Sequence, residues 1–364
     1  MLVDGHEDLA WNMLTFGRDY TLPAAATRAR ERGSATVERN GETMLGSADW
    51  RKGGVGLVFG ALFASPMSYG IEAWETLAFD DGDGESAHRA YRRELTAYDE
   101  LFDRHPELFA PIRSRNDLAR HLTNWEASDE SARRLGIVVL MEGAYGVRSP
   151  EEVGQWNEWG VRIIGPSWMT ASAYAGGTRE PGPLTKQGNR LLQQMSSEGL
   201  ILDVSHLSEQ SARQAIDAYE GQVIASHSNP RALLMHTKYP ERHLSDQVID
   251  ALVKRGAVIG MVLGNSFLSN DWVSSQSRSD VTLETVVAHI DYVCQRAGHA
   301  KSVGIGSDFD GGFGRGKCPT GLESVADLPK LADPLLAKGY STADVDAVLG
   351  DNWIRMLQQA LPEG

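Results

Sequence analysis

Residues 200–219 read LILDVSHLSEQSARQAIDAY, and this stretch contains the unit from which the fold is predicted. Its first part, Leu200–Val204, is a short apolar run, which is typical of a strand buried on both faces of a parallel sheet. Its second part, Ser208–Tyr219, has the apolar spacing of a helix. Between them lies His206, an ionisable residue at the end of the strand. A parallel α/β fold follows if the same pattern recurs along the chain.

The pattern of a short apolar run recurs along the whole sequence. We expect eight strands, at Leu2–Gly5, Val55–Phe63, Gly136–Met141, Val161–Ile164, Leu200–Val204, Gln222–Ala225, Ala257–Leu263 and Ser302–Gly306. Helical spacing lies between several of them, for example at Leu191–Ser197, Ser245–Lys254 and Leu283–Arg296. Strand followed by helix, repeated eight times, predicts an α/β fold of the (β/α)8 TIM-barrel class.

One long interruption, about residues 64–135, follows the second predicted strand. Structureless loops of this length are uncommon, so we expect a helical insertion with two or more helices, one of them through Arg89–Phe102. Ala343–Leu361 is expected to form one or two closing helices. Barrels with insertions reach 364 residues as one domain, so residues 1–364 are predicted to form a single barrel domain.

Composition and charge exclude several classes of partner. The formal net charge of −14 argues against nucleic acid, because binding to phosphate backbones needs clustered Lys and Arg. The two cysteines, Cys294 and Cys318, are too few for a disulfide framework and are expected to be free thiols. No leader-type segment and no apolar run of membrane-spanning length occurs in the sequence. We therefore expect a soluble, cytoplasmic protein with no membrane partner.

Metal-type ligands follow five of the predicted strands. The carboxyl ends of the strands form the face of a barrel where catalytic residues gather. Residues two apart on a strand share a side, so His6 and Asp8 can converge on one point. The residues expected to meet at this face are His6, Asp8, Glu142, His206, His227 and Asp308.

This set of side chains exceeds what one catalytic zinc needs, because such sites use three protein ligands and a water. Two ions bridged by a carboxylate and a hydroxide agree better with the number of ligands. Glu142 is the natural bridge, since its strand lies between those that carry the histidines. His6 and Asp8 are then predicted to bind one ion, and His206 and His227 the other.

Asp308, after the last predicted strand, is expected to handle the proton of the reaction. A carboxylate there could accept a proton from the attacking water and deliver it to the leaving amine. The alternative is that Asp308 is a buried acid that orients a ligand histidine, and Asp310 is a second candidate for that role. Glu142 could instead cap a helix.

The same residues carry a resemblance to a known family. Five ordered motifs resemble those of the membrane (renal) dipeptidase family, peptidase family M19: Asp4-Gly5-His6-Glu7-Asp8, Met141-Glu142-Gly143, Leu202-Asp203-Val204-Ser205-His206, Ala225-Ser226-His227-Ser228 and Gly306-Ser307-Asp308-Phe309-Asp310-Gly311. The resemblance implies a barrel of the amidohydrolase type, two zinc ions per chain and hydrolysis of dipeptides. It places the metal ligands, the bridge and the proton-handling acid on the residues assigned above.

The resemblance also implies how substrate is held. Arg242 is similar to the family arginine that binds the C-terminal carboxylate of the dipeptide, and a guanidinium fork can pair bidentately with a carboxylate. Arg231 and ordinary surface salt bridges are the alternative for this region. One departure concerns Trp168, which stands where the family prototype has a substrate-contacting His. Trp168 is predicted to line the substrate pocket or, alternatively, to pack at the top of the barrel.

The resulting hypothesis is a zinc-dependent dipeptidase that uses a metal-bridging hydroxide. Its expected substrates are L-Xaa-L-Xaa dipeptides, with L-Xaa-D-Xaa dipeptides as a further candidate class. The alternatives are a binuclear metal hydrolase acting on another amide or a lactone, and a metal-binding barrel without turnover. The chain lacks the disulfide cysteines and anchor tail of the animal members, so it resembles the bacterial soluble branch. The family also makes a homodimer plausible. Histidines on predicted helices, such as His88, His105, His121 and His289, are expected to be structural.

Overall fold

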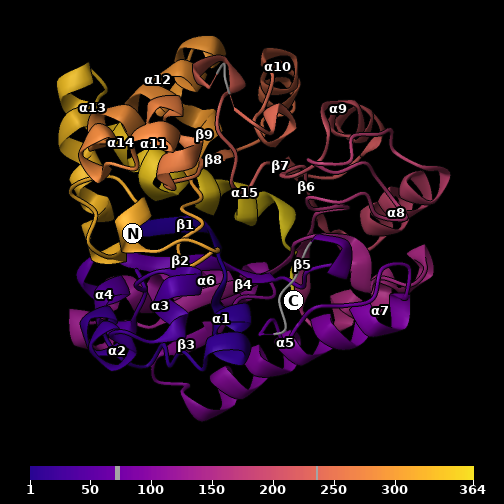
Figure 1. Ribbon diagram of the computed structural model, residues 1–364, viewed down its shortest axis with the longest axis horizontal. Coiled ribbons are helices and arrows are strands. Elements are labelled where there is room, and N and C mark those ends of the chain that lie inside the picture. The colour runs from indigo at the N-terminus through magenta and orange to yellow at the C-terminus, as the bar shows by residue number, and fades with distance from the viewer. Residues whose placement is uncertain (70–73, 235–236) are drawn as a thin grey trace.

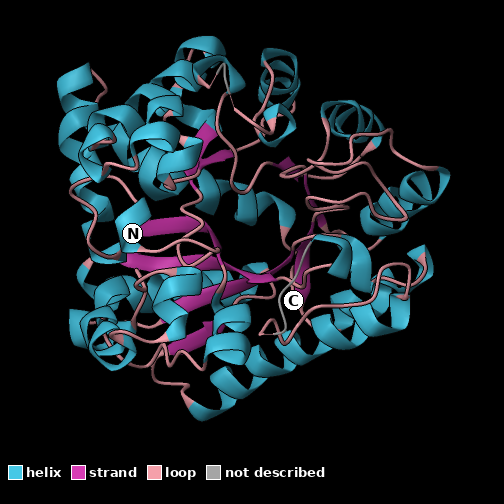
Figure 2. Cartoon of the chain, viewed as in Figure 1, coloured by secondary structure: helices cyan, strands magenta, loops and turns pink. Residues whose placement is uncertain are grey.

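The computed structural model describes residues 1–69, 74–234 and 237–364. Its strands lie at the centre, and the helices lie around them (Figure 2). The strands found in this part of the chain are β1 (Leu2–Glu7), β2 (Val55–Leu62), β3 (Phe109–Pro111), β4 (Leu135–Met141), β5 (Val161–Ile164), β6 (Ile201–Asp203), β7 (Val223–Ile224), β8 (Ile259–Met261) and β9 (Val303–Ile305).

The strands form a parallel barrel that is nearly closed. Neighbouring strands follow the order β7-β6-β5-β4-β2-β1-β9-β8, and their pairs are parallel. A parallel bridge between Ala225, just after β7, and Ile259 in β8 links the two ends of this order. The eight predicted strands are all present, and the predicted (β/α)8 TIM-barrel class is confirmed. Several strands are shorter than predicted, because the chain leaves the ladder before its apolar run ends.

The helices of the described chain include the periodic segments that the sequence predicts. They are α1 (Leu9–Phe16), α2 (Ala24–Glu31), α3 (Ala35–Asn40), α4 (Ser47–Lys52), α5 (Gly84–Arg104), α6 (Arg115–Ala127), α7 (Val153–Glu158), α8 (Lys186–Ser197), α9 (Glu209–Ala218), α10 (Asp246–Lys254), α11 (Asn270–Ser275), α12 (Leu283–Ala297), α13 (Ala332–Lys338), α14 (Thr342–Asp346) and α15 (Asn352–Ala360). The predicted segment 208–219 forms α9, and Ser208 caps it by accepting a hydrogen bond from the Ser211 amide. A π-helical turn, Ala347–Asp351, joins α14 to α15.

The insertion after β2 contains two long helices, as expected. Helix α5 runs along the lower edge of the view in Figure 1, and α6 follows it. Between them lies β3, a strand that the sequence analysis did not predict; it pairs in parallel with β4, off the barrel path. Three residues, one of them Pro111, give too short an apolar run to be recognised. The assignment of residues 1–364 to one domain stays a prediction.

Side chains of the C-terminal helix pack against the inward side chains of the barrel strands. Trp353, Met356 and Leu357 of α15 form one apolar cluster with inward side chains of the strands, among them Phe59 and Val138. Helix α15 accordingly lies inside the ring of strands in Figure 1. The Trp353 indole is packed so closely that a Cβ at Gly304 would lie 2.3 Å from its Nε1. The core therefore holds the strands in place, and the carboxyl ends of the strands remain available for a site.

Candidate metal centre

Six of the predicted site residues meet at the carboxyl ends of the strands. His6 lies in β1, and Glu142 follows β4 directly. His206, His227 and Asp308 lie in the loops after β6, β7 and β9. His206 and Asp308 have left-handed backbone conformations, with φ of 67° and 60°, which are sparsely populated by non-glycine residues. These six side chains are buried: His6, Asp8, Glu142, His206, His227 and Asp308.

Glu142 lies at the middle of the group. Its Oε1 is 3.0 Å from His206 Nε2 and 3.1 Å from His227 Nε2, and these two nitrogens are 3.0 Å apart. Its Oε2 is 3.8 Å from His6 Nε2. The two oxygens of Glu142 therefore face different histidines, which is the arrangement expected of a bridging carboxylate.

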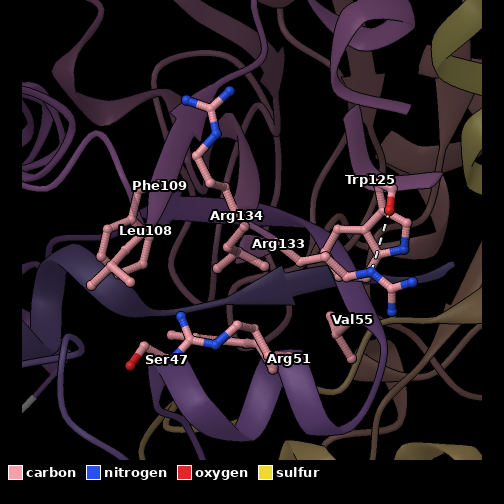
Figure 3. Close-up of a pocket in the computed structure, with 10 residues that line it drawn as sticks. Ser47, Arg51, Val55, Leu108, Phe109, Trp125, Arg133 and Arg134 are labelled. Carbon is pink, nitrogen blue, oxygen red and sulfur yellow. Dashed lines mark hydrogen bonds between the residues drawn. The ribbon is translucent and has the colours of Figure 1, made fainter. Parts of the chain in front are cut away.

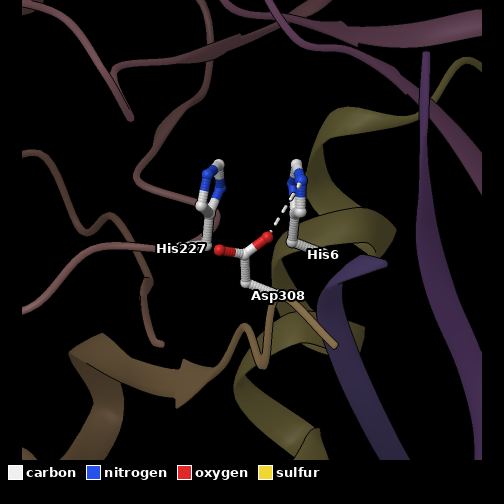
Figure 4. Close-up of side chains that lie close together, drawn as sticks. All are labelled: His6, His227 and Asp308. Atoms are coloured by element: carbon white, nitrogen blue, oxygen red, sulfur yellow. Dashed lines mark ion pairs between the residues drawn. The ribbon is translucent and has the colours of Figure 1, made fainter. Parts of the chain in front are cut away.

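His6 connects the other two acids to this arrangement. Its Nε2 is 3.7 Å from Asp8 Oδ2 and 4.0 Å from Asp308 Oδ1. Figure 4 shows the Asp308 carboxylate facing the space between the rings of His6 and His227, whose centroids are 3.7 Å apart. Three overlapping sets of ligand atoms result, each within 4.8 Å: His6, Asp8 and Glu142; Glu142, His206 and His227; and His6, His227 and Asp308.

Two residues behind His227 fix its tautomer. The Ser226 hydroxyl donates to Asp203 Oδ2 at 2.5 Å, so its oxygen accepts the hydrogen bond from His227 Nδ1 at 2.7 Å. The proton of His227 therefore lies on Nδ1, and the lone pair of Nε2 points at Glu142 and His206. Asp203 also accepts from the amides of Ser205 and Ser226, so the loops that carry His206 and His227 are joined through it.

The sequence analysis did not assign Asp203 and Ser226 to the site. Both lie inside motifs that it quoted, and a serine next to a ligand histidine is the available signal. What the sequence did not reveal is that the two loops converge on the Asp203 carboxylate.

Buried polar atoms without partners indicate that the group is built for cations. Within the described residues, both ring nitrogens of His6, Oδ1 of Asp8 and Nδ1 of His206 are buried and lack a hydrogen-bond partner. Buried polar atoms are normally satisfied, so an unsatisfied group of this kind needs an explanation. Imidazole and carboxylate are the ligands that zinc and related divalent ions take. The donor set is therefore suited to divalent metal.

The electrostatics of the group point the same way. Burial opposes the charged form of His6, yet Glu142, Asp8 and Asp308 together raise its pKa to about 10. Burial lowers the pKa values of His206 and His227 well below their usual range, so both rings are neutral, as metal ligation requires. Burial raises the pKa of Asp308 to about 7, although His6 opposes this shift. The acids attract positive charge to the centre.

Arg242 is placed next to the cluster and keeps a free donor. The residue is 5% exposed, and its Nη1 donates to the carbonyl oxygen of His227 at 2.9 Å. Its Nη2 is buried and has no hydrogen-bond partner among the residues that the structure describes. Arg231, the alternative from the sequence, instead pairs with Glu209 at 2.7 Å and Glu241 at 3.8 Å. Arg242 is thus the arginine with a nitrogen available beside the cluster.

A large cavity opens over the cluster. Its volume is about 1120 Å³, and its lining includes Asp8, Glu142, His206, Asp308 and Arg242. Trp168 also lines it, with its ring centroid 6.0 Å from that of His206. Both positions assigned to substrate binding from the sequence, Arg242 and Trp168, therefore border the same space as the cluster.

A second crevice lies at the other end of the barrel strands and is too small for a ligand (Figure 3). It is lined by residues at the amino ends of β2 and β4, including Val55 and Leu135, and by Arg51 and Trp125. Its volume is about 10 Å³, which is at the lower limit for a single water.

The remaining histidines examined in the sequence have structural contacts. His88, His121 and His289 each lie within hydrogen-bond distance of a backbone carbonyl, those of Gly146, Gly56 and Leu268. His105 lies 3.5 Å from Glu107 near the surface.

Comparison with known proteins agrees with this geometry. The family described as "Membrane dipeptidase (Peptidase family M19)" matches residues 1–362. The chain belongs to peptidase family M19. The resemblance predicted from the five motifs is confirmed, and the protein is a hydrolase of the metallo-dipeptidase class. Membership also implies metal dependence.

Relatives of this M19 protein include dipeptidases from fungi. It is 26% identical to dipeptidase aclJ of Aspergillus oryzae over 368 residues, which cover 98% of this chain and 77% of aclJ. It is 29% identical to dipeptidase tcpJ of Claviceps purpurea over 288 residues, or 76% of this chain and 62% of tcpJ. The alignments therefore leave part of each longer relative without a counterpart.

A solved structure supports the fold. A metallo peptidase from Rhodobacter sphaeroides, liganded with a phosphinate mimic of the dipeptide L-Ala-D-Ala, has a TM-score of 0.76 to this M19 protein at 22% identity, over 99% of both chains. In the part of the chain that is described, no helix has both the length and the apolar character needed to cross a bilayer.

Proposed function

We propose that this M19 protein is a two-zinc dipeptidase that hydrolyses small dipeptides whose C-terminal carboxylate is bound by Arg242. The observation that carries the proposal is the convergence of three imidazoles and three carboxylates around Glu142 in a buried group with unpartnered nitrogens. A barrel with no metal chemistry has no need of such a group.

The ligands would be divided between two ions. His6, Asp8 and Glu142 would hold one ion, and Glu142, His206 and His227 the other. When bound, such ions lower the pKa of water and polarise a carbonyl oxygen. The Asp203–Ser226 pair keeps the Nε2 lone pair of His227 turned toward this position.

Asp308 is the residue proposed to move the proton. Its carboxylate lies beside His6, borders the cavity and carries no hydrogen bond that would occupy its oxygens within the described residues. An oxygen of Asp308 would accept the proton from the attacking water and later donate it to the nitrogen of the leaving amine. Glu142, in the bridging position, would be the other catalytic carboxylate.

Arg242 is proposed to orient the dipeptide. Its Nη1 is held by the His227 carbonyl, and Nη2 is left to donate to the substrate carboxylate. We expect Arg242→Lys to raise KM about tenfold or more with a smaller change in kcat, because Lys lacks the planar fork. Steady-state kinetics with one dipeptide would check this. A normal KM in Arg242→Lys would contradict the assignment.

The next question is whether the C-terminal residue of the substrate is an L- or a D-amino acid. The structurally similar Rhodobacter protein binds a mimic of L-Ala-D-Ala. We therefore propose that the C-terminal residue of the substrate can be D as well as L. A homodimer stays a prediction from the resemblance.

A binuclear hydrolase of another amide or a lactone is the second candidate. The observation that favours it is Trp168, which borders the cavity at the position where a histidine was expected and offers at most an indole N–H. Assays on lactones and acylated amines beside dipeptides separate the two candidates.

The deciding experiment measures amine release by the zinc-loaded protein from L-Xaa-L-Xaa and L-Xaa-D-Xaa dipeptides. Cleavage that is lost on chelation, returns with zinc and is absent in Asp308→Asn supports the proposal. Silence across the panel with two zinc ions bound per chain would contradict it, and activity on lactones or acylated amines would then identify the second candidate. Silence on all of these would leave a metal-binding barrel.

A further inference from the structure

The cavity over the cluster is larger and more aromatic than cleavage of a small dipeptide requires. Its volume of about 1120 Å³ exceeds the ~300–1,000 Å³ of ordinary small-molecule pockets. Of the 26 described residues that line it, nine are Phe, Tyr or Trp, whereas such residues make up 8% of the chain. Aromatic side chains are therefore concentrated where substrate binds.

Four of these rings form a continuous surface, here called the Trp168 wall: Trp11, Phe63, Tyr69 and Trp168. The ring of Phe63 packs edge-on against Trp168 at 4.7 Å and against Trp11 at 5.9 Å. Tyr69 packs against Trp168 at 4.7 Å. The wall is joined to the metal cluster, because the ring of Trp168 neighbours that of His206. Thr178 also links these two residues: its amide donates to the carbonyl oxygen of Trp168, and its hydroxyl donates to that of His206.

The rings of the wall offer apolar surface. Among the described residues, Glu75 is an acid that contacts the wall; it is 9% exposed and already accepts hydrogen bonds from Trp11 Nε1 at 2.8 Å and the Leu77 amide at 3.0 Å. The outer ring, Tyr69, is covered by the Arg179 guanidinium at 4.8 Å. The wall is thus preformed and its buried polar atoms are engaged, which is the character of an apolar binding surface.

Arg242 contacts a different histidine of the cluster from Trp168, which would give the substrate a direction. It bonds to the carbonyl of His227, and its guanidinium covers Phe267 at 5.2 Å. Trp168 neighbours His206 instead. A dipeptide with its carboxylate on Arg242 and its scissile carbonyl at the cluster therefore extends its N-terminal residue past His206, toward Trp168.

We propose that the Trp168 wall is the subsite for the side chain of the N-terminal residue, and that this side chain is large and apolar, an aromatic ring above all. The proposal rests on the proposed dipeptidase function and names its substrate class. Rings prefer edge-to-face or offset contact with other rings, and the rings of the wall already pack edge-on or tilted against one another beside the cavity. A small side chain would leave the wall in contact with water.

The test compares kcat/KM of the zinc-loaded full chain for L-Phe-L-Ala, L-Trp-L-Ala, L-Ala-L-Ala and the reversed L-Ala-L-Phe. We expect the aromatic-first dipeptides to exceed L-Ala-L-Ala by about tenfold or more, and to exceed the reversed peptide as well. Trp168→Ala is expected to remove most of this preference, and Trp168→Leu to remove part of it. Phe313→Leu, on the Phe267 side of the cavity, is expected to keep the preference.

A binding measurement separates this proposal from the catalytic one. Calorimetry with zinc-loaded Asp308→Asn should show tighter binding of L-Phe-L-Ala than of L-Ala-L-Ala, and Trp168→Ala in that background should remove the difference. Equal kcat/KM for all dipeptides, or a preference that follows the C-terminal residue, would overturn the subsite and leave the dipeptidase intact. Neither cleavage nor binding of any dipeptide would overturn both. Thermal unfolding of each variant verifies that it is folded.

Discussion

Asp308 and Asp310 lie two residues apart after β9 and share a left-handed backbone, with φ of 60° and 64°, yet their surroundings are opposite. Asp310 is wholly buried, and both oxygens of its carboxylate have hydrogen-bond donors. Its carboxylate is held by four groups from the N-terminal segment: the Tyr20 hydroxyl at 2.9 Å, the Thr43 hydroxyl at 2.5 Å, the Met44 amide at 2.8 Å and the Arg18 guanidinium at 3.0 Å.

Within the described residues, Asp308 has no such partners. Throughout residues 1–69, 74–234 and 237–364, no hydrogen bond is formed to its carboxylate, which faces His6 at 4.0 Å and the cavity. A saturated carboxylate holds the fold together, whereas an unsaturated one beside other unsaturated ligands is available for chemistry. Their partners, more than their positions or backbone conformations, therefore distinguish the two acids.

The largest effect is expected from Asp308→Asn. The amide keeps the shape of the side chain and loses the proton acceptor, so kcat should fall about 10²–10⁴-fold. The free energy of unfolding should change little, because no ion pair closer than 4.0 Å is removed. Steady-state kinetics measures the fall in kcat, and urea denaturation of the same preparation measures the free energy of unfolding. Wild-type turnover in this variant would show that Asp308 is not the functional acid.

Asp310→Asn should act on stability instead. The change removes one anionic partner of the buried Arg18 guanidinium, whose side chain is 0% exposed, and leaves Glu31 as the other. Losing charge-assisted hydrogen bonds of this kind costs about 1.5–3 kcal/mol of unfolding free energy. The urea midpoint reports the loss. A loss below about 1 kcal/mol together with an inactive but stable protein would reverse the roles of the two acids.

Gly311→Ala tests how tightly Asp308 is positioned. An added Cβ would lie 2.1 Å from Asp308 Oδ1 and 2.7 Å from Asp8 Oδ2, so both carboxylates must move. A displacement of this size is expected to lower kcat/KM about 10²-fold and to release bound metal. Gly316→Ala is the matched control, because its Cβ would meet no atom within 4 Å. Unchanged metal content and activity in Gly311→Ala would contradict the placement of the two acids.

The smallest effect is expected at Glu94, a third buried acid that is neither saturated like Asp310 nor part of the cluster. It is 0% exposed, and burial, with Asp8, Glu75 and Glu142 nearby, raises its pKa well above the usual range. Its folded pKa is above its unfolded pKa, so stability is lost as pH rises from the unfolded pKa toward the folded one. Glu94→Gln removes this loss. The unfolding free energy of the variant minus that of wild type should therefore be about 1 kcal/mol larger at pH 8 than at pH 4. A gain that does not depend on pH would contradict the prediction.

The sequence predicts the position of Asp308 better than the partners of Asp310, for a physical reason. Strand ends in a parallel barrel must meet at one face, so a ligand that follows a short apolar run can be placed without tertiary information. His6, Glu142 and His227 were found in this way. The eight barrel strands follow from the same local pattern.

The partners of Asp310 could not be found in that way. Arg18, Tyr20 and Thr43 lie between 267 and 292 residues away from it along the chain, around helices α1–α4 that the sequence analysis did not assign. Helix α3, for example, has only six residues, so its apolar period is too short to recognise. The Trp168 wall likewise joins rings from helix α1, the segment after β2 and the segment after β5, and only their packing reveals it.

Two ions bound around Glu142 are proposed to produce the dipeptidase activity. The most direct measurement is the rate of amine release from a dipeptide as zinc is added stepwise to the metal-free protein, with bound zinc per chain measured at each step. We expect the rate to rise to its maximum as the second ion binds, and Glu142→Gln to bind less zinc and stay inactive. Full activity with one ion bound, or no activity with two, would contradict it.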